Sequence, residues 1–77
     1  MAVYFMQIGA AGPIKIGHAS APYKRRSNLQ TVSAAPIEVL AIVDGGREEE
    51  QATHRLFSHL HLRGELFTPA DDLLEYV

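Results

Sequence analysis

The sequence predicts an α+β fold, in which helices flank a small three-stranded antiparallel sheet in the order ββαβα, followed by a short C-terminal helix. Two short apolar runs around a turn open the chain, a β-branched run follows at residues 37–43, and helix signals come after these segments. A sheet covered by helices is the simplest layered arrangement that buries the apolar faces of all these segments. At 77 residues, the chain is expected to form a single domain over residues 1–77.

The first two strands are expected to form a β-hairpin. Residues 3–8 are aromatic and apolar, residues 9–13 include two glycines and a proline, and residues 14–17 alternate in polarity. This succession of strand, turn and strand predicts antiparallel pairing. A suitable register would place Tyr4 and Lys15 side by side on the two strands.

A helix is predicted over residues 21–31, because Ser20 can cap its N-terminus and Pro22 is tolerated in a first helical turn. Pro36 prevents the helix from continuing. The segment at 37–43 is nearly all apolar and is the clearest strand of the chain. Its continuous hydrophobicity predicts a central strand that is covered on both faces.

Two further helices are predicted in the C-terminal half. The first spans about residues 47–62 and ends before Gly64, and the second begins at Thr68 with Pro69 in its first position. Apolar residues of both helices are expected to pack on the sheet: Leu56, Phe57 and Leu60 from the first, and Leu73, Leu74 and Val77 from the second.

The composition favours a soluble intracellular protein, cytoplasmic in a bacterium or in a phage-infected host cell. There is no cysteine, so disulfides and thiolate zinc sites are excluded. No charged segment precedes an apolar signal region, and no apolar run reaches the roughly 18 residues of a membrane span. A chain of this length buries only about 60% of its unfolded surface, so a thin core and marginal stability are expected.

Charge is distributed unevenly along the chain. Residues 1–37 carry four cations and no acid, whereas residues 38–77 carry three arginines and nine acids, which gives a net charge of −2. The positive half is suited to a phosphate backbone, and the acidic half is suited to a divalent metal. An ordinary polarised surface would show the same distribution.

The basic residues of the first predicted helix are candidates for contacts with phosphate. Arg25 lies four residues before Leu29, so both share a helical face and Arg25 is directed toward the rim of the sheet. A fixed guanidinium there would stabilise negative charge on a reacting phosphate. Arg26 is turned about 100° away and, with Lys24, would face a nucleic-acid backbone or solvent. Alternatively, Arg25 is itself an ordinary surface side chain.

Three residues near the hairpin are candidates for proton transfer. A lysine that is buried or flanked by cations has a lowered pKa and can act as a base, which could apply to Lys15, and neighbouring cations would activate the phenol of Tyr4 in the same way. His18 could face the same cleft as a base, or it could cap a loop. All three are also compatible with ordinary structural roles.

Glu50 and His54 lie four residues apart on the second predicted helix and can meet one ligand or each other. One carboxylate with several waters is enough to hold Mg²⁺, because this ion keeps most of its hydration shell. A plain hydrogen bond on the helix surface has the same spacing, and two side chains are too few for structural zinc. Other residues could join this centre or serve the fold alone: Glu65, which could instead pair with Arg63 or Arg47, and the two histidines His59 and His61.

These residues, in this order and spacing, resemble the motifs of the GIY-YIG nuclease superfamily. Val3-Tyr4-Phe5 stands at its first strand motif, and Lys15-Ile16-Gly17 stands at its second, with lysine in place of the usual tyrosine. Arg25 falls at the helix arginine of that family, and Glu50 falls at its metal-binding glutamate. The resemblance extends over residues 2–68.

The likeness is greatest to a bacteriophage-associated branch that carries Lys-Ile-Gly at the second motif. Three further segments agree with that branch: Leu29-Gln30-Thr31, His54-Arg55-Leu56-Phe57 and Gly64-Glu65-Leu66-Phe67. Two features depart from it. The late asparagine of the family has no counterpart, with Glu65 in that region, and Leu66 replaces an aromatic residue.

The resemblance implies a small αβ domain that cleaves a nucleic-acid strand with Mg²⁺ or Mn²⁺ as cofactor. DNA is expected as the substrate more than RNA, and a homodimer or a protein partner would supplement weak binding by this acidic module. For such a nuclease, the residues and the resemblance together predict catalysis by Tyr4, Lys15, Arg25, Glu50 and His54, with Glu50 as metal ligand. Nucleic-acid binding is expected from Lys24, Arg25 and Arg26, and support from His18 and Glu65.

Two other functions fit the sequence. The missing tyrosine of the second motif favours a degenerate module that binds nucleic acid or a protein partner without cutting. The thin core, together with Val32, Ala34 and Ala35 near a predicted surface, favours a dimeric structural or regulatory protein.

Overall fold

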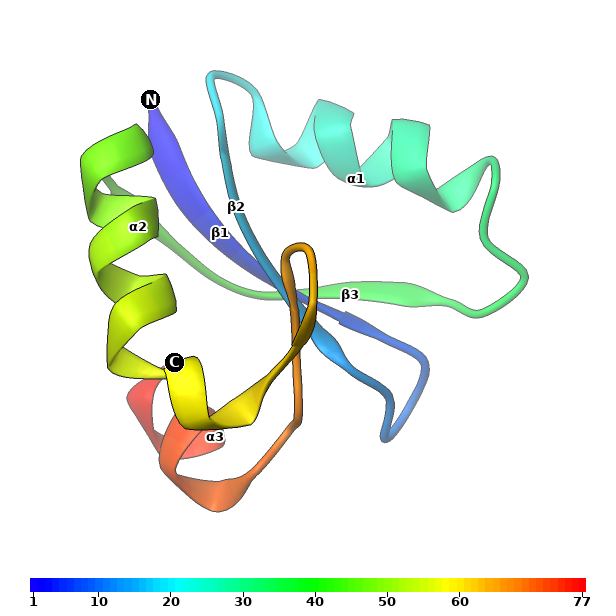
Figure 1. The fold of residues 1–77 in the computed structure, drawn as a ribbon. Helices are drawn as coiled ribbons and strands as arrows, with labels where there is room; N and C mark the ends of the chain where they lie inside the picture. Colours follow the sequence, from blue (N-terminus) through cyan, green and yellow to red (C-terminus); the bar gives the residue numbers. More distant parts are fainter.

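The computed structural model describes all of residues 1–77 as a five-stranded antiparallel sheet with three α-helices (Figure 1). The elements in chain order are β1 (Ala2–Ile8), β2 (Ile14–Ala19), α1 (Pro22–Gln30), β3 (Ile37–Asp44), α2 (Arg47–Leu56), the 3₁₀ helix η1 (Ser58–Leu60), β4 (His61–Arg63), β5 (Leu66–Phe67) and α3 (Asp71–Tyr76). The strands lie in the order β3-β1-β2-β5-β4. The predicted α+β class is confirmed. None of the helices has the length and apolar character needed to span a bilayer.

The predicted three-stranded sheet is wrong, because a small second hairpin, β4–β5, extends the sheet beyond β2. The helix expected over residues 47–62 ends at Leu56, since Phe57 leaves the helical conformation (φ −108°, ψ 24°) and is buried in the core. Gly64 (φ +56°) makes the hairpin turn instead of ending a helix. At three and two residues, β4 and β5 are too short to leave an alternating pattern in the sequence.

β3 lies at an edge of the sheet, so the prediction of a central strand is also wrong. Its apolar run has a different cause, because its side chains pack into both layers of the domain. Leu40 and Ala41 contact one hydrophobic cluster, and Val39 and Ile42 contact the other. An edge strand that is covered on both faces therefore has the same continuous apolar sequence pattern as a central strand.

α1 agrees closely with its prediction, although its N-cap position is Ala21, one residue later than expected. Leu29 packs toward the sheet, as predicted. Two polar side chains of α1 bond the start of the free β3 edge: Arg26 Nε donates to the carbonyl of Ile37 at 2.9 Å, and the Ile37 N–H donates to Gln30 Oε1 at 2.8 Å. Arg26 therefore has a structural role between α1 and β3.

α3 begins at Asp71 with Ala70 at its N-cap position, two residues after the predicted cap at Thr68. The N–H of Thr68 donates to the carbonyl of Leu60 at 2.8 Å, so this residue still continues the β4–β5 hairpin instead of capping a helix. Leu73 is fully buried, as predicted. Two leucines that were expected to pack are instead 55% and 40% exposed: Leu56 and Leu74.

Each face of the sheet carries a hydrophobic cluster, and β1 contributes to both. Val3 and Phe5 belong to the cluster on the α2 face, which also contains Ile14, Ile16, Phe57, Phe67 and Leu73; Tyr4 and Met6 belong to the cluster on the α1 face, with Ala19 and Ile37. Figure 1 shows α2 and α3 as neighbours, with α1 apart from them. Full burial of one such aliphatic or aromatic side chain contributes about 1.5–3 kcal/mol, so these clusters fix the positions of all three helices.

Gly17 allows the sheet to hold the ring of Tyr4. The two residues lie directly opposite each other in the β1–β2 register. A Cβ atom at Gly17 would lie 2.5 Å from the Tyr4 hydroxyl oxygen and 2.8 Å from Glu65 Oε1. The β2–β5 register covers only Ile14 and Lys15, so the β2 edge next to Gly17 has no neighbouring strand. This open edge positions the candidate site.

We expect Gly17→Ala to lower the free energy of unfolding by about 1–3 kcal/mol, because the added methyl group overpacks against Tyr4. Urea unfolding followed by circular dichroism measures the change. Gly46→Ala is the matched control, since the nearest atom to its added Cβ is Met1 Cβ at 3.8 Å. An equal loss of stability in the two variants would contradict the close packing at Gly17.

Candidate active site

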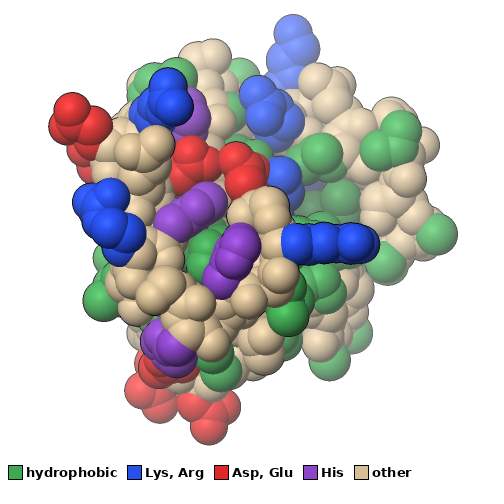
Figure 2. All heavy atoms as spheres, viewed as in Figure 1, with side chains coloured by type: hydrophobic (Ala, Val, Ile, Leu, Met, Phe, Trp, Pro, Cys, Tyr) green, Lys and Arg blue, Asp and Glu red, His purple; other side chains and the backbone are tan.

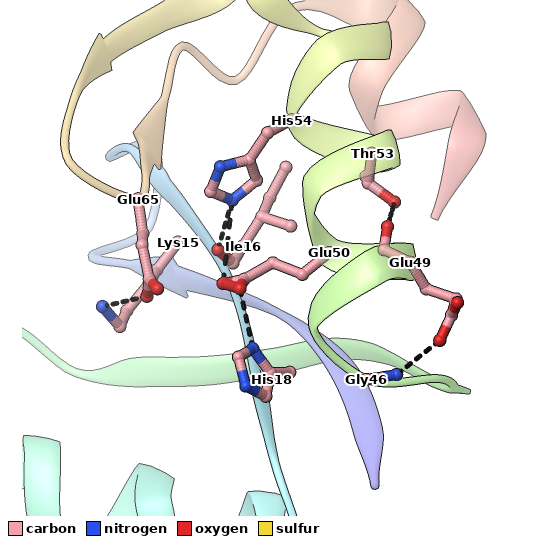
Figure 3. A network of polar contacts seen from close by, with 9 residues as sticks. All are labelled: Lys15, Ile16, His18, Gly46, Glu49, Glu50, Thr53, His54 and Glu65. Atoms are coloured by element: carbon pink, nitrogen blue, oxygen red, sulfur yellow. Dashed lines mark hydrogen bonds and ion pairs between the residues drawn. The ribbon is translucent and has the colours of Figure 1, made fainter.

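Glu50 is a charged residue of the core, and it is only 6% exposed. It lies in the first half of α2, which packs against β2. Its Oε2 is 2.7 Å from His18 Nδ1, within hydrogen-bond distance. Its Oε1 is buried without a hydrogen-bond partner and lies 4.0 Å from His54 Nε2. Figure 3 shows the carboxylate between the two imidazoles.

The hydrogen bonds define the roles of the nitrogens in both imidazoles. A carboxylate and a backbone carbonyl only accept hydrogen bonds. His18 therefore donates from Nδ1 to Glu50, which leaves its Nε2 free to accept a proton. His54 donates from Nε2 to the carbonyl of Ile16 at 2.8 Å. His18 is thus placed as a base, whereas His54 is anchored to β2.

Tyr4 is fully buried, and its hydroxyl makes no hydrogen bond. Burial raises the pKa of Tyr4 above its ordinary value of 10.0. The positive charge of Lys15 opposes this rise, the negative charge of Glu65 adds to it, and Arg25 opposes it as well. The phenol is therefore protonated at neutral pH. It can donate a hydrogen bond to a ligand, and it is not a base.

Lys15 and Glu65 form an ion pair, with 2.8 Å between Lys15 Nζ and Glu65 Oε1. Lys15 stands opposite Met6 in the register, so it lies diagonal to Tyr4 instead of directly beside it. Although burial acts to raise it, the hydrogen bond and the charge of Lys15 hold the pKa of Glu65 below its usual 4.5. Glu65 is therefore ionised at neutral pH, and its Oε1 lies beside Gly17.

Arg25 is exposed on α1 and approaches the Tyr4 hydroxyl closely enough to affect the pKa of that group. Lys24 is also exposed, and with Arg25 it borders a shallow depression of about 160 Å³ at the start of α1. Both cations are therefore available to a ligand. Arg26, the third residue predicted to contact nucleic acid, is less available to a ligand, because its guanidinium donates hydrogen bonds to Ile37 and Gln30 within the fold.

The predicted site residues converge on the open edge of β2 at Gly17. Tyr4, Lys15 and Arg25 come from the α1 face, and His18, Glu50 and His54 come from the α2 face. Glu65, from the β4–β5 turn, connects the two groups, because it pairs with Lys15 and lies close to Glu50. Figure 2 shows two acidic side chains together on this surface, with histidine and basic side chains around them.

The site fits a hydrated divalent cation better than a caged one. No three His, Asp or Glu side chains form a ready metal-binding group. Mg²⁺ needs only one or two carboxylates, because waters complete its octahedral shell. The buried and unpartnered Oε1 of Glu50 suits a single protein ligand of this kind.

Three features of the site escaped the sequence prediction. The close approach of Gly17 to Tyr4 depends on the strand register, the His18–Glu50 contact joins residues 32 positions apart, and the anchor of His54 is a backbone carbonyl. Only Gly17 left a signal, as a glycine inside a strand pattern, which indicates a close approach of another group.

Comparison with protein-family models, with curated proteins and with solved structures finds no match for this chain. Its function is therefore inferred from its own residues and their geometry.

We expect Glu65→Gln to lower the free energy of unfolding at neutral pH by about 0.5 kcal/mol, a modest effect because the Glu65 side chain is 38% exposed and solvent screens the pair. Since the pKa of Glu65 is lowered in the folded state, this contribution is present above about pH 4.5 and is lost as the pH falls through the lowered value. Urea unfolding over a range of pH tests this.

Glu75→Gln is the control for that measurement, because Glu75 is exposed and outside the ion pairs. A difference between wild type and Glu65→Gln that stays constant from neutral pH into acid would contradict the Lys15–Glu65 interaction.

Proposed function

We propose that the protein is a divalent-metal-dependent endonuclease that hydrolyses phosphodiester bonds, of DNA more than of RNA. The observation that supports this most is the meeting of a guanidinium from α1, a buried carboxylate from α2 and a phenol from β1 around Gly17. Phosphodiester hydrolysis needs an activated water, cations on the charge that develops at phosphorus, and support for the leaving oxygen. The motif resemblance to GIY-YIG nucleases favours the same reaction.

In this proposal, the substrate phosphate lies over Gly17, beside Arg25 and Tyr4. Arg25 donates to the phosphate oxygens and neutralises the charge that grows in the transition state. The protonated phenol of Tyr4 donates a hydrogen bond to the phosphate or to the attacking water, which gives its buried hydroxyl a partner. Lys15 adds positive charge while Glu65 holds it in place.

His18 is the proposed general base. Its Nδ1–H is bound to Glu50, so its Nε2 can take the proton of the water that attacks phosphorus, and the Glu50 carboxylate then stabilises the imidazolium. The free Oε1 of Glu50 would hold Mg²⁺ or Mn²⁺, which when bound supplies Lewis-acid stabilisation of phosphate charge. Glu50 therefore supports both halves of the proposed reaction through its two oxygens.

A module that binds nucleic acid without cutting it is the second candidate. The observation that favours it concerns the two motif residues on the strands: Lys15 Nζ is occupied by its contact with Glu65 at 2.8 Å, and burial raises the pKa of Tyr4, so its phenol stays protonated. Neither side chain is therefore free to take a proton from water. If His18 also fails to do so, the exposed cations Lys24 and Arg25 would give only salt-dependent binding.

The proposal is tested by incubating the purified protein with plasmid, single-stranded DNA or RNA, in Mg²⁺, Mn²⁺ or EDTA. We expect cleavage only with metal. Glu50→Gln should slow it by about 100-fold or more, because the anionic metal ligand and the negative charge that would stabilise the His18 imidazolium are both lost. His18→Asn should cost about 10²–10⁴-fold, the usual contribution of a general base, and Arg25→Ala about 10²–10³-fold.

Two matched variants control for charge and folding. Glu48→Gln changes an exposed glutamate of the same helix, and His59→Ala changes an exposed histidine outside the candidate site, where it contacts Asp72. Both should cut at the wild-type rate, with all variants folded by circular dichroism. Equal cleavage by Glu50→Gln and Glu48→Gln would defeat the assignment, and salt-sensitive binding by a wild-type protein that never cuts would favour the second candidate.

A further inference from the structure

A second hollow adjoins the candidate active site. Its volume is about 260 Å³, and its lining residues come from α2, η1 and the β4–β5 hairpin: His54, Arg55, Ser58, His61 and Phe67. Figure 2 shows two histidine side chains beside a hydrophobic hollow, next to the pair of acidic side chains. The hollow is smaller than the roughly 300–1,000 Å³ of pockets for drug-sized ligands, so it suits one compact group.

The walls of this hollow are rings held at fixed angles. The imidazoles of His54 and His61 lie 4.9 Å and 5.2 Å from the ring of Phe67, centroid to centroid, and are inclined to it by 60° and 56°. Phe67 is fully buried, so it supports the two imidazoles from below and offers little surface of its own. A ligand in the hollow would therefore contact imidazole faces.

Hydrogen bonds hold both imidazoles in place. His54 Nε2 donates to the carbonyl of Ile16 at 2.8 Å, and His61 Nε2 donates to the carbonyl of Gly64 at 2.9 Å. Each ring keeps its Nδ1 for a ligand. The exposed guanidinium of Arg55 stands at the rim, where it can stack on a planar group or bind an anion. Rigid aromatic faces with a guanidinium are the surface that holds an unstacked nucleobase.

The hollow shares one residue, His54, with the candidate active site. The Nε2 atom of His54 lies 4.0 Å from Glu50 Oε1, the oxygen assigned above to the metal. A base in the hollow would therefore belong to a nucleotide whose phosphate lies near Glu50 and Gly17. We propose that the hollow binds one unpaired base of the strand being cut, so that the substrate is single-stranded or locally unpaired nucleic acid; this rests on the proposed nuclease function.

Two further properties favour an unpaired strand over an intact duplex. A base that is stacked and paired can enter a side pocket only if it is extruded from the duplex, which costs unstacking and unpairing energy. An unpaired base enters the pocket without this cost. The net charge of −2 disfavours binding along a long duplex backbone, which depends on many contacts between cations and phosphates. Stacking on one fixed pocket needs only a short stretch of strand.

The test is fluorescence anisotropy of a labelled single-stranded oligonucleotide in EDTA, where the strand stays intact. A strand of the same length made only of abasic residues serves as the phosphate-only probe, and the matching duplex is a third probe. We expect the base-containing strand to bind tightest. His61→Ala should weaken it about 5- to 30-fold, the loss of one base–aromatic contact, and should leave abasic binding unchanged.

Arg55→Ala, at an exposed helix position, is the second variant in case His61→Ala disturbs the β4–β5 turn. Because its guanidinium can also bind phosphate, this variant should weaken both strands, and the base-containing strand more than the abasic one. His59→Ala, an exposed histidine outside the hollow, should have no effect. A free nucleoside monophosphate, added as competitor, should displace the strand only weakly, because it lacks the neighbouring phosphates. Strong displacement would overturn the assignment to a strand and indicate a free-nucleotide site.

Equal binding of base-containing and abasic strands, or equal effects of His61→Ala and His59→Ala, would overturn the pocket even if the protein cuts. Base-dependent binding by a protein that never cuts in Mg²⁺ or Mn²⁺ would support the pocket and overturn the nuclease proposal. The two proposals therefore fail separately.

Discussion

The burial of Glu50 against β2 is the interaction on which the candidate site depends. A buried carboxylate costs free energy unless both oxygens are paired, and here only Oε2 has a partner. The packing of α2 on the sheet, secured by Phe57 at its end, holds the charge in that position. Unsatisfied buried groups of this kind are expected at functional or strained sites, and this is the reason that we propose Glu50 as a metal ligand.

The second constraint is an incomplete sheet edge. β5 pairs with β2 over only two residues, so the edge is open where Gly17 lacks a side chain. Groups from the two faces of the sheet, which would normally be separated by it, can therefore approach one another there. The same hairpin that leaves this edge open also places Glu65 beside Lys15 and Gly17, and His61 in the neighbouring hollow. Its short strands thus contribute more to the site than to the sheet.

Helical and strand periodicity predicted the parts of this arrangement that depend on local spacing. The long apolar runs gave the α+β class, the Arg25–Leu29 spacing oriented Arg25, and the Glu50–His54 spacing set those two side chains on one face. The β4–β5 hairpin left no such signal, and a continuous apolar run does not distinguish a central strand from an edge strand covered on both sides, as β3 is. The partner of His18 was not predictable either, since it is selected by tertiary packing of α2 on β2.

The divalent cation that we propose would bind at Glu50, near Gly17. Titration of ¹⁵N-labelled protein with Mn²⁺ is the sharpest test of this site, because the paramagnetic ion broadens the amide signals nearest to it. We expect the signals of Gly17, His18, Glu50 and Glu65 to broaden first, at low Mn²⁺. Early broadening at the exposed acids of α3, Asp71 and Asp72, with Gly17 and Glu50 unaffected, would contradict it.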